Sequence, residues 1–321
     1  MALLTLGIGE GHEVIVPSFA FIAVANAVLH VCATPVFADI DPVTLNLTPS
    51  TIEPLITPRT RAILVVHTFG IPADMHALRT LATRHDLVII EDACEALGAE
   101  LDQRRVGAFG DLAVFGFYPN KQITTGEGGA VLAHIQPHAD RLRSFRNQGR
   151  APNPASTVES SPVADWLHHP DIGFNYRLSD IACALGRVQL SRLGEILALR
   201  HAAAERYHAL LSEIPGLELP PLTLPGCTLS WFVFVVRLPK SIDRSGLQAL
   251  LFRQGIATAT YFAPIHLQPA WRDLIVQTRS HLPVTESVSS RTLALPFFTR
   301  IISTQQEQVA SALRQGLDHT K

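Results

Sequence analysis

A carboxylate and an amine in the first half of the sequence have the types and positions needed to do chemistry together. Asp92 follows the apolar run 87–90, separated from it only by Glu91, and Lys121 follows a second apolar run, 112–117. Open α/β sheets bind their ligands at the carboxyl ends of strands, where both residues are expected. An amine can hold an aldehyde and a carboxylate can keep a ring nitrogen protonated, which are the requirements of a pyridoxal phosphate site. There Lys121 would hold the cofactor and, once displaced by an amino donor, move a proton as a general base.

Each member of this pair also has an ordinary explanation. Asp92 precedes Ala-Cys-Glu-Ala and is a good N-cap residue for a following helix. A lone lysine in a loop, such as Lys121, is usually a solvated surface charge. The stretch 124–129 favours the functional interpretation of Lys121, because its glycines let the backbone approach a ligand closely. Position alone leaves both interpretations of Asp92 open.

Strands and helices must alternate along the first half of the chain to bring these two residues together. Apolar runs of the β type are separated by helical stretches four times before residue 120, which predicts a doubly wound α/β layer with a mostly parallel sheet. The predicted strands are 13–17, 35–38, 60–66 and 87–90, and the predicted helices are 19–31, 74–85 and a short one from residue 49.

The second half of the chain predicts a smaller α+β domain packed on the large one. The expected elements are a long helical segment over 181–211, strands over 229–238 and 256–262, and a helix over 244–254. We place the boundary near residue 200, which gives a large α/β domain of residues 1–200 and a small domain of residues 201–321.

Composition and charge exclude several classes of partner. The 321 residues are 47% apolar and carry 26 basic against 28 acidic side chains, so neither nucleic acid nor an anionic membrane is expected as a partner. The apolar run 19–38 is interrupted by His30 and Pro35, which predicts a helix and a strand rather than a membrane span. The four cysteines are far apart, so we expect no metal site or disulfide framework, and a reducing cytoplasmic location.

Four motifs together carry a resemblance to a known family. In chain order they are VIVPSFAFIAVANAV, EDACEALGA, GDLAVFGFYPNKQITTGEGGAV and GFNYRLSD. They resemble the DegT/DnrJ/EryC1/StrS family of pyridoxal phosphate-dependent sugar aminotransferases, from residue 4 to about residue 315 and in the family's order. The resemblance implies the fold-type I aminotransferase architecture.

The resemblance also implies a reaction. Members transfer an amino group from glutamate or glutamine to a keto group of a nucleotide-linked sugar, in the biosynthesis of polysaccharide, lipopolysaccharide or glycosylated metabolites. Lys121 matches the lysine that binds the cofactor, and Asp92 matches the acid that pairs with its ring nitrogen. Phe21 matches an aromatic residue that stacks on the ring, although core packing in a helix also explains it. Asn175 matches an asparagine that reaches the cofactor phosphate of a neighbouring subunit, which implies a homodimer.

Two matched positions depart from the family's commonest pattern. Glu95 stands where many members have a glutamine near the phenolic oxygen of the ring, and a carboxylate there changes the hydrogen bonding unless it is protonated or paired. Gly116 stands where many members have a phosphate-binding serine. His266 and Tyr176 are the candidates for contact with the sugar substrate, and a structural role is the alternative for His266.

The front of the sequence departs furthest from the family. Members carry several tens of residues before the segment LGIG, including a Ser-Gly-Thr turn at a helix N-terminus that binds the cofactor phosphate. The sequence lacks this turn, so we expect an N-terminally truncated chain. The alternative function is therefore a non-catalytic family member with impaired cofactor binding.

Overall fold

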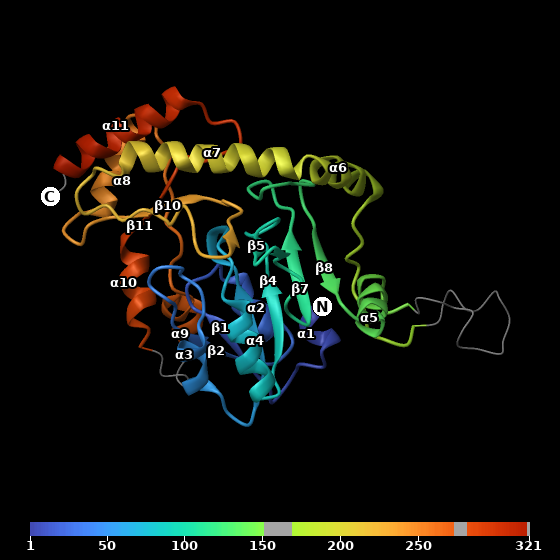
Figure 1. The fold of residues 1–321 in the computed structure, drawn as a ribbon. Helices are drawn as coiled ribbons and strands as arrows, with labels where there is room; N and C mark the ends of the chain where they lie inside the picture. Colours follow the sequence, from blue (N-terminus) through green and yellow to red (C-terminus); the bar gives the residue numbers. More distant parts are fainter. Residues whose placement is uncertain (151–168, 273–280, 320–321) are drawn as a thin grey trace.

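A mostly parallel sheet lies at the centre of the larger part of the molecule (Figure 1). The computed structural model describes residues 1–150, 169–272 and 281–319. Within them the sheet contains β1 (Glu13–Pro17), β2 (Thr34–Ala38), β3 (Thr60–Val66), β4 (Val88–Asp92), β7 (Leu112–Gly116) and β8 (Gly129–Ala133), in the order β2-β1-β3-β4-β7-β8. Only β8 runs antiparallel to its neighbour. The predicted doubly wound, mostly parallel sheet is confirmed.

Helices cover both faces of this sheet because its strands bury side chains on both sides. Val14 and Val16 share one apolar cluster with α2 (Ala23–His30), whereas Ile15 shares another with α4 (Met75–Arg84). This two-sided burial explains why the strands read as continuous apolar runs. The other helical segments of this part are α1 (Ala2–Thr5), α3 (Pro49–Ile52), η1 (Glu53–Leu55), η2 (Thr68–Gly70) and α5 (Gln136–Arg146).

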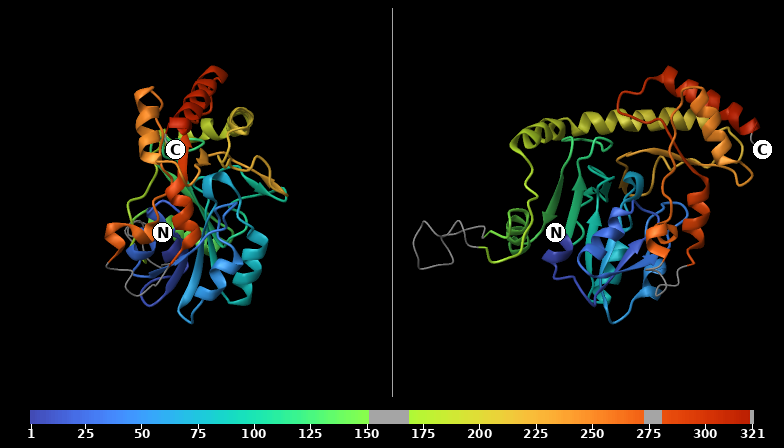
Figure 2. Two further views of the ribbon diagram at one scale, coloured as in Figure 1. Left: turned by 90° about the vertical axis from the view of Figure 1, so that its left-hand side faces the viewer. Right: turned by 180° about the vertical axis from the view of Figure 1, so that it is seen from behind.

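A smaller α+β layer lies beyond the carboxyl ends of the parallel strands (Figures 1 and 2). Its elements are α6 (Asp180–Ser191), α7 (Leu193–Leu211), α8 (Arg244–Arg253), α11 (Ser303–His319) and the antiparallel pair β10 (Phe234–Arg237) and β11 (Thr292–Leu295). The predicted helix over 181–211 is interrupted at Arg192, where the backbone leaves helical geometry (φ −100°, ψ 3°). A small second sheet of β5 (Glu100–Leu101), β6 (Arg104–Arg105) and β9 (Cys227–Thr228) connects the two layers.

The predicted strand over 256–262 is wrong. Only Ala259 pairs there, in a single bridge with Ala294, because the chain turns away to pack on the large layer. The elements that follow are η5 (Ile265–Leu267), α9 (Pro269–Arg272) and α10 (Pro283–Arg291). Ile265 and Trp271 share an apolar cluster with β1. Residues beyond 200 thus contribute to the core of the large layer, and a domain boundary near residue 200 stays a prediction.

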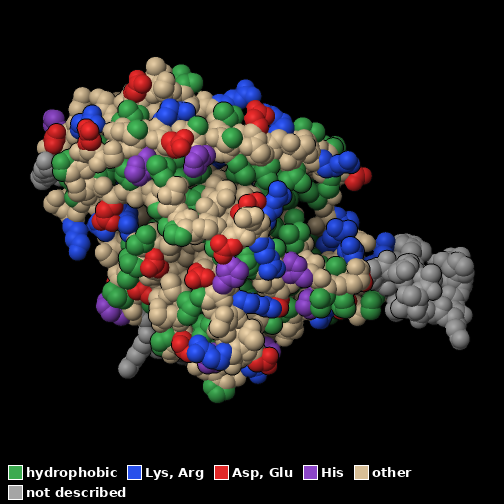
Figure 3. All heavy atoms as spheres, in the orientation of Figure 1, with side chains coloured by type: hydrophobic (Ala, Val, Ile, Leu, Met, Phe, Trp, Pro, Cys, Tyr) green, Lys and Arg blue, Asp and Glu red, His purple; other side chains and the backbone are tan. Residues whose placement is uncertain are grey.

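The surface shows no concentration of one charge sign on the face in Figure 3, where basic and acidic side chains are interspersed. This agrees with the near balance of charges in the sequence. Among the helices that the structure describes, none combines the length and apolar character that crossing a bilayer requires.

Glu91 anchors the end of β4 through hydrogen bonds to its carboxylate. Its buried carboxylate accepts hydrogen bonds from His67 Nε2 (3.0 Å) and from the backbone N–H groups of Gly107 and Phe109 (both 2.7 Å). His67 Nδ1 in turn accepts from the Ala73 N–H (3.1 Å), which places the ring proton on Nε2. Burial alone would raise the pKa of Glu91, but the hydrogen bonds from His67 and the backbone hold it below its usual value. The residue before Asp92 is therefore rigidly held.

We expect Glu91→Gln to destabilise the fold by about 3 kcal/mol, because the amide would direct its own N–H groups at donors that need an acceptor. Urea unfolding measures this loss. Glu100→Gln, at a half-buried position with one long ion pair to Arg105, is the control and should change stability by no more than about 0.5 kcal/mol. Equal effects of the two substitutions would contradict the anchoring role of Glu91.

Candidate active site

Lys121, Glu95 and Asp92 come together at the carboxyl ends of β4 and β7. The two strands are parallel neighbours, with Asp92 paired to Val114, so the segments that leave them start side by side. Lys121 Nζ lies 3.9 Å from Glu95 Oε1, and its side chain is 16% exposed. Lys121 is therefore a mostly buried cation beside a carboxyl group, and the interpretation of it as a solvated surface charge is wrong.

Asp92 is followed by a turn rather than by a helix. Residues 93–98 form turns, so the interpretation of Asp92 as a helix N-cap is wrong. Its Oδ1 accepts a hydrogen bond from the Cys94 N–H (3.0 Å). A carboxylate can accept several hydrogen bonds, so this contact leaves capacity for a further N–H donor.

Gly116 lies against the same group of residues. A Cβ added to it would stand 3.4 Å from Cys94 Sγ and 3.8 Å from Lys121 Cε. Burial raises the pKa of the Cys94 thiol, and the nearby Asp92 raises it further, so this thiol stays protonated. The absence of a side chain at residue 116 lets Cys94 and the side chain of Lys121 pack close to the end of β7.

Glu95 is the most strongly perturbed acid near Lys121. Burial raises its pKa to about 7, although attraction to Lys121 and a hydrogen bond from the Phe69 N–H (2.9 Å) act in the opposite direction. Because 3.9 Å is long for an ion pair, desolvation dominates. The carboxyl group therefore changes its charge near neutral pH.

This raised pKa gives stability a specific pH dependence. The folded state binds the Glu95 proton more tightly than the unfolded state. The contribution of this proton to the free energy of unfolding is therefore full below the ordinary pKa of about 4.5 and is lost as pH rises through about 7. Stability should therefore decrease between pH 5 and pH 8, as measured by urea midpoints of the cofactor-free protein. We expect Glu95→Gln to remove the part of this decline that comes from Glu95. Glu10→Gln, at an exposed position, should leave the decline unchanged. A wild-type slope in Glu95→Gln would contradict the assignment.

The other residues singled out in the sequence lie away from Lys121 or are buried differently. Phe21 lies in the link between β1 and α2 and is 64% exposed, so the alternative interpretation of it, core packing in a helix, is wrong. Helix α2 starts only at Ala23. Asn175 and Tyr176 are exposed, and the chain there runs beside the end of α5, with the Tyr176 N–H donating to Arg146 O (3.0 Å). The described contacts of Asn175 and Tyr176 within this chain do not include Lys121.

His266 lies inside the protein, only 6% exposed. Its Nδ1 lies 2.6 Å from Ser18 Oγ, and its Nε2 lies 3.3 Å from Glu286 Oε1. Ser18 directly follows β1, so this contact ties η5 to the segment that carries Phe21. The geometry favours a structural role for His266, and its contact with a substrate stays a prediction.

Two residues near Lys121 were missed by the sequence patterns. The ring centroid of Phe232 lies 4.2 Å from Lys121 Nζ, and Arg200 donates to the carbonyl oxygen of Phe232 (2.5 Å). Arg200 stands in the buried stripe of α7 together with Ile196, Ala203 and Tyr207. A charged residue at an apolar position of a helix is a signal that could have identified it.

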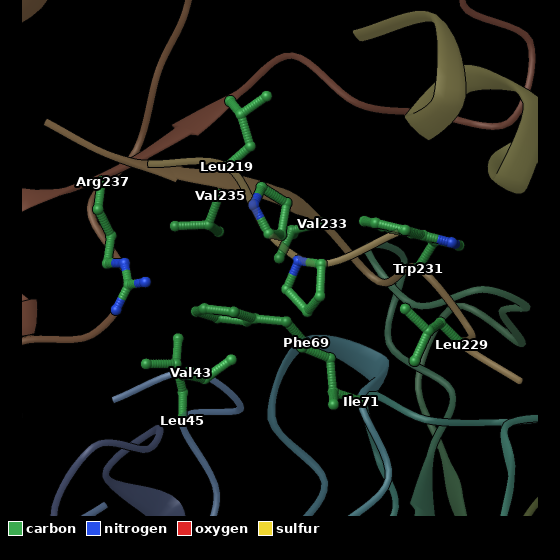
Figure 4. Close-up of a pocket in the computed structure, with 12 residues that line it drawn as sticks. Val43, Leu45, Phe69, Ile71, Leu219, Leu229, Trp231, Val233, Val235 and Arg237 are labelled. Carbon is green, nitrogen blue, oxygen red and sulfur yellow. The ribbon is translucent and has the colours of Figure 1, made fainter. Parts of the chain in front are cut away.

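The segment before β10 meets the loop after β3 at this site. The Phe232 N–H donates to Phe69 O (3.2 Å) and the Ser230 N–H donates to Gly70 O (3.0 Å). On its other side Phe69 lines a small apolar pocket with Leu45 and Val233 (Figure 4). The two layers are therefore joined by both backbone bonds and apolar packing directly beside Glu95 and Lys121.

Comparison with known proteins places this geometry in a family. The model of the DegT/DnrJ/EryC1/StrS aminotransferase family matches residues 1–314. GDP-perosamine synthase from Caulobacter vibrioides is 38% identical over 320 residues, which cover 99% of this chain and 82% of the relative. The solved structure of DesV from S. venezuelae is 39% identical, with a TM-score of 0.88, over 100% of this chain and 82% of its own. DesI, solved in the presence of its TDP-sugar product, is 32% identical, with a TM-score of 0.86, over 98% of this chain and 77% of its own.

Aminotransferases of this family depend on pyridoxal phosphate, and the residues at the strand ends fit that cofactor. A buried amine stands beside the end of one strand, and the carboxylate of Asp92, which has hydrogen-bonding capacity left, ends its neighbour. With a family match over nearly the whole chain, these observations lead to one conclusion. The chain belongs to the DegT/DnrJ/EryC1/StrS family and is a pyridoxal phosphate-dependent aminotransferase.

Proposed function

We propose that this enzyme transfers an amino group from glutamate or glutamine to a keto group of a nucleotide-linked sugar. The observation that carries the proposal is the placement of Lys121 and Asp92 at the ends of adjacent parallel strands. The relatives support the substrate class, since one is a GDP-perosamine synthase and another was solved with a TDP-sugar product. We place the reaction in the cytoplasm, in the biosynthesis of polysaccharide, lipopolysaccharide or glycosylated metabolites.

In this proposal the residues divide the work by their chemistry. When bound, pyridoxal phosphate supplies an electron-withdrawing ring that stabilises negative charge on the carbon bearing the amino group. Asp92 would accept the ring N–H and keep that nitrogen protonated. Lys121 would hold the cofactor covalently and, when free, would carry a proton at its ε-amine to or from the substrate carbon. Glu95 lies beside Lys121 and takes or releases a proton near neutral pH, and Phe21 would contact the ring.

We also propose that the working unit is a homodimer. Asn175 is exposed and belongs to a segment that runs beside α5 rather than toward Lys121. An exposed asparagine with this placement is suited to reach the cofactor phosphate of a neighbouring subunit, and Tyr176 and His266 remain the proposed contacts to the sugar. Sedimentation at working concentration tests this arrangement, and a monomer with full activity would contradict it.

The function itself is tested with the purified chain, pyridoxal phosphate and a panel of GDP-, TDP- and UDP-linked keto sugars. With glutamate as donor, we expect release of 2-oxoglutarate and a mass change in one sugar that corresponds to replacement of its keto oxygen by an amino group and a hydrogen atom. Glutamine is tested in parallel to separate the two donors. A protein that binds the cofactor but releases keto acid from neither donor would contradict the proposal.

A further inference from the structure

Arg200 is a buried cation that lacks a carboxylate partner among the described residues. It is 4% exposed, and burial lowers the pKa of its guanidinium to about 10, so the group is still charged at neutral pH. Its contacts are all neutral: Nε donates to Trp231 O (2.6 Å), Nη2 to Phe232 O (2.5 Å) and Nη1 to Thr299 Oγ1 (3.3 Å). Buried charges are normally paired. A guanidinium has five N–H groups, so two remain beyond these three contacts.

Arg200 and Lys121 line one cavity of about 420 Å³. The other lining residues are apolar, aromatic or neutral polar, and the described lining contains no acidic side chain. Glu95 lies beside Lys121, at 3.9 Å, and offsets part of that charge. The cation in this cavity without a carboxylate near it is therefore Arg200.

One residue, Phe232, contacts both Arg200 and Lys121. Arg200 holds the backbone carbonyl of Phe232, and the ring of the same Phe232 lies 4.2 Å from Lys121 Nζ. The guanidinium also lies over the ring of Phe297, 4.9 Å from its centroid, which fixes its plane. The fork of the guanidinium is therefore preorganised in the cavity that Lys121 also lines.

We propose that Arg200 binds a carboxylate of the amino-acid donor, an inference that rests on the proposed function of this cavity. A guanidinium and a carboxylate form paired N–H···O hydrogen bonds that are stronger than those between neutral groups. An amino acid carries its amine and its carboxylate a few bonds apart. A donor bound in this cavity thus presents its amine to the side of Lys121 and its carboxylate to Arg200.

The test is the binding of glutarate, an unreactive dicarboxylate, compared with neutral glutaramide, by calorimetry on the cofactor-free protein. We expect the wild type to prefer glutarate and Arg200→Lys to weaken glutarate binding about 10- to 100-fold, because the fork is lost while the charge remains. Arg244→Lys is the matched control, since Arg244 is also partly buried and donates to the backbone carbonyls of Ser289 and Thr292 outside this cavity. Unchanged glutarate binding in folded Arg200→Lys would overturn the proposal.

A second variant decides the question if Arg200→Lys fails to fold. In Lys121→Ala the cation that remains in the described cavity lining is Arg200, so the preference for glutarate over glutaramide should persist. Its disappearance would show that Lys121 attracted the anion and would overturn the proposal.

Steady-state kinetics separates this inference from the proposed function. Arg200→Lys should raise the KM for glutamate and leave the KM for the keto sugar unchanged. An enzyme that aminates sugars with a wild-type KM for glutamate in Arg200→Lys would refute the role of Arg200 and leave the function standing. Carboxylate binding at Arg200 without turnover of any sugar would support the role of Arg200 and refute the proposed function.

Discussion

Lys121→Ala is expected to lower kcat by at least about 10⁴-fold, because it removes both the covalent hold on the cofactor and the base that moves the proton. The structure places this lysine beside Glu95 and under the ring of Phe232, with 16% of its side chain exposed. The cofactor should still bind without a covalent link, so its absorption in the variant should match that of free pyridoxal phosphate. Initial rates with glutamate and the accepted sugar measure the loss.

The exposed Lys240 provides the control for this experiment. Lys240→Ala should keep wild-type rates and the wild-type absorption of bound cofactor. Circular dichroism checks that both variants are folded. A folded Lys121→Ala enzyme that retains a tenth of the wild-type rate would show that a different group performs the chemistry.

Asp92→Asn is expected to lower kcat roughly 10²- to 10³-fold. This loss corresponds to removing the carboxylate from a buried ion pair, here the one expected between Asp92 and the protonated ring nitrogen of the cofactor. The neutral amide has nearly the same shape, and its oxygen can still accept from the Cys94 N–H, as Oδ1 does at 3.0 Å. It lacks the negative charge that keeps the ring nitrogen protonated. The turn after β4 should therefore survive while the ring withdraws electrons less well.

Covalent attachment of the cofactor separates the role of Asp92 from that of Lys121. Asp92→Asn should still bind pyridoxal phosphate covalently, whereas Lys121→Ala should not. The thermal midpoint of Asp92→Asn should stay near that of the wild type, because its hydrogen bond within the turn is kept. Wild-type turnover in folded Asp92→Asn would contradict the assignment of the ring partner.

The sequence was sufficient to predict the parallel strands of the sheet and the position of Asp92, but not the antiparallel strand β8. Strands such as 60–66 are buried on both faces and read as unbroken apolar runs, and a parallel sheet then places their carboxyl ends on one edge. The helix N-cap interpretation of Asp92 failed because the N-cap preference of a residue is local. It contains no information about the tertiary packing that turns the chain toward Gly116. Lys121 could be placed beyond the end of β7, but its burial beside Glu95 depends on tertiary packing.

The features that were missed arise between segments that are distant in the sequence. Phe232 and Lys121 are more than a hundred residues apart and meet only because the backbone near Phe69 bonds the segment before β10. The segment 256–262 has the composition of a strand but makes only one bridge to β11, and the chain after it packs Ile265 and Trp271 on the cluster of β1, which no local pattern reports. Arg200 was visible in the sequence as a charge in an apolar stripe, but its cavity was not.

The central claim is that Lys121 holds the cofactor, and borohydride reduction followed by peptide mass spectrometry tests it directly. The chain has only three lysines, Lys121, Lys240 and Lys321, so the assignment is unambiguous. After incubation with pyridoxal phosphate and reduction, the added phosphopyridoxyl mass should be found on the peptide that contains Lys121 and should be absent when glutamate is supplied before reduction. Labelling of Lys240 or Lys321 instead, or of no lysine, would contradict the account.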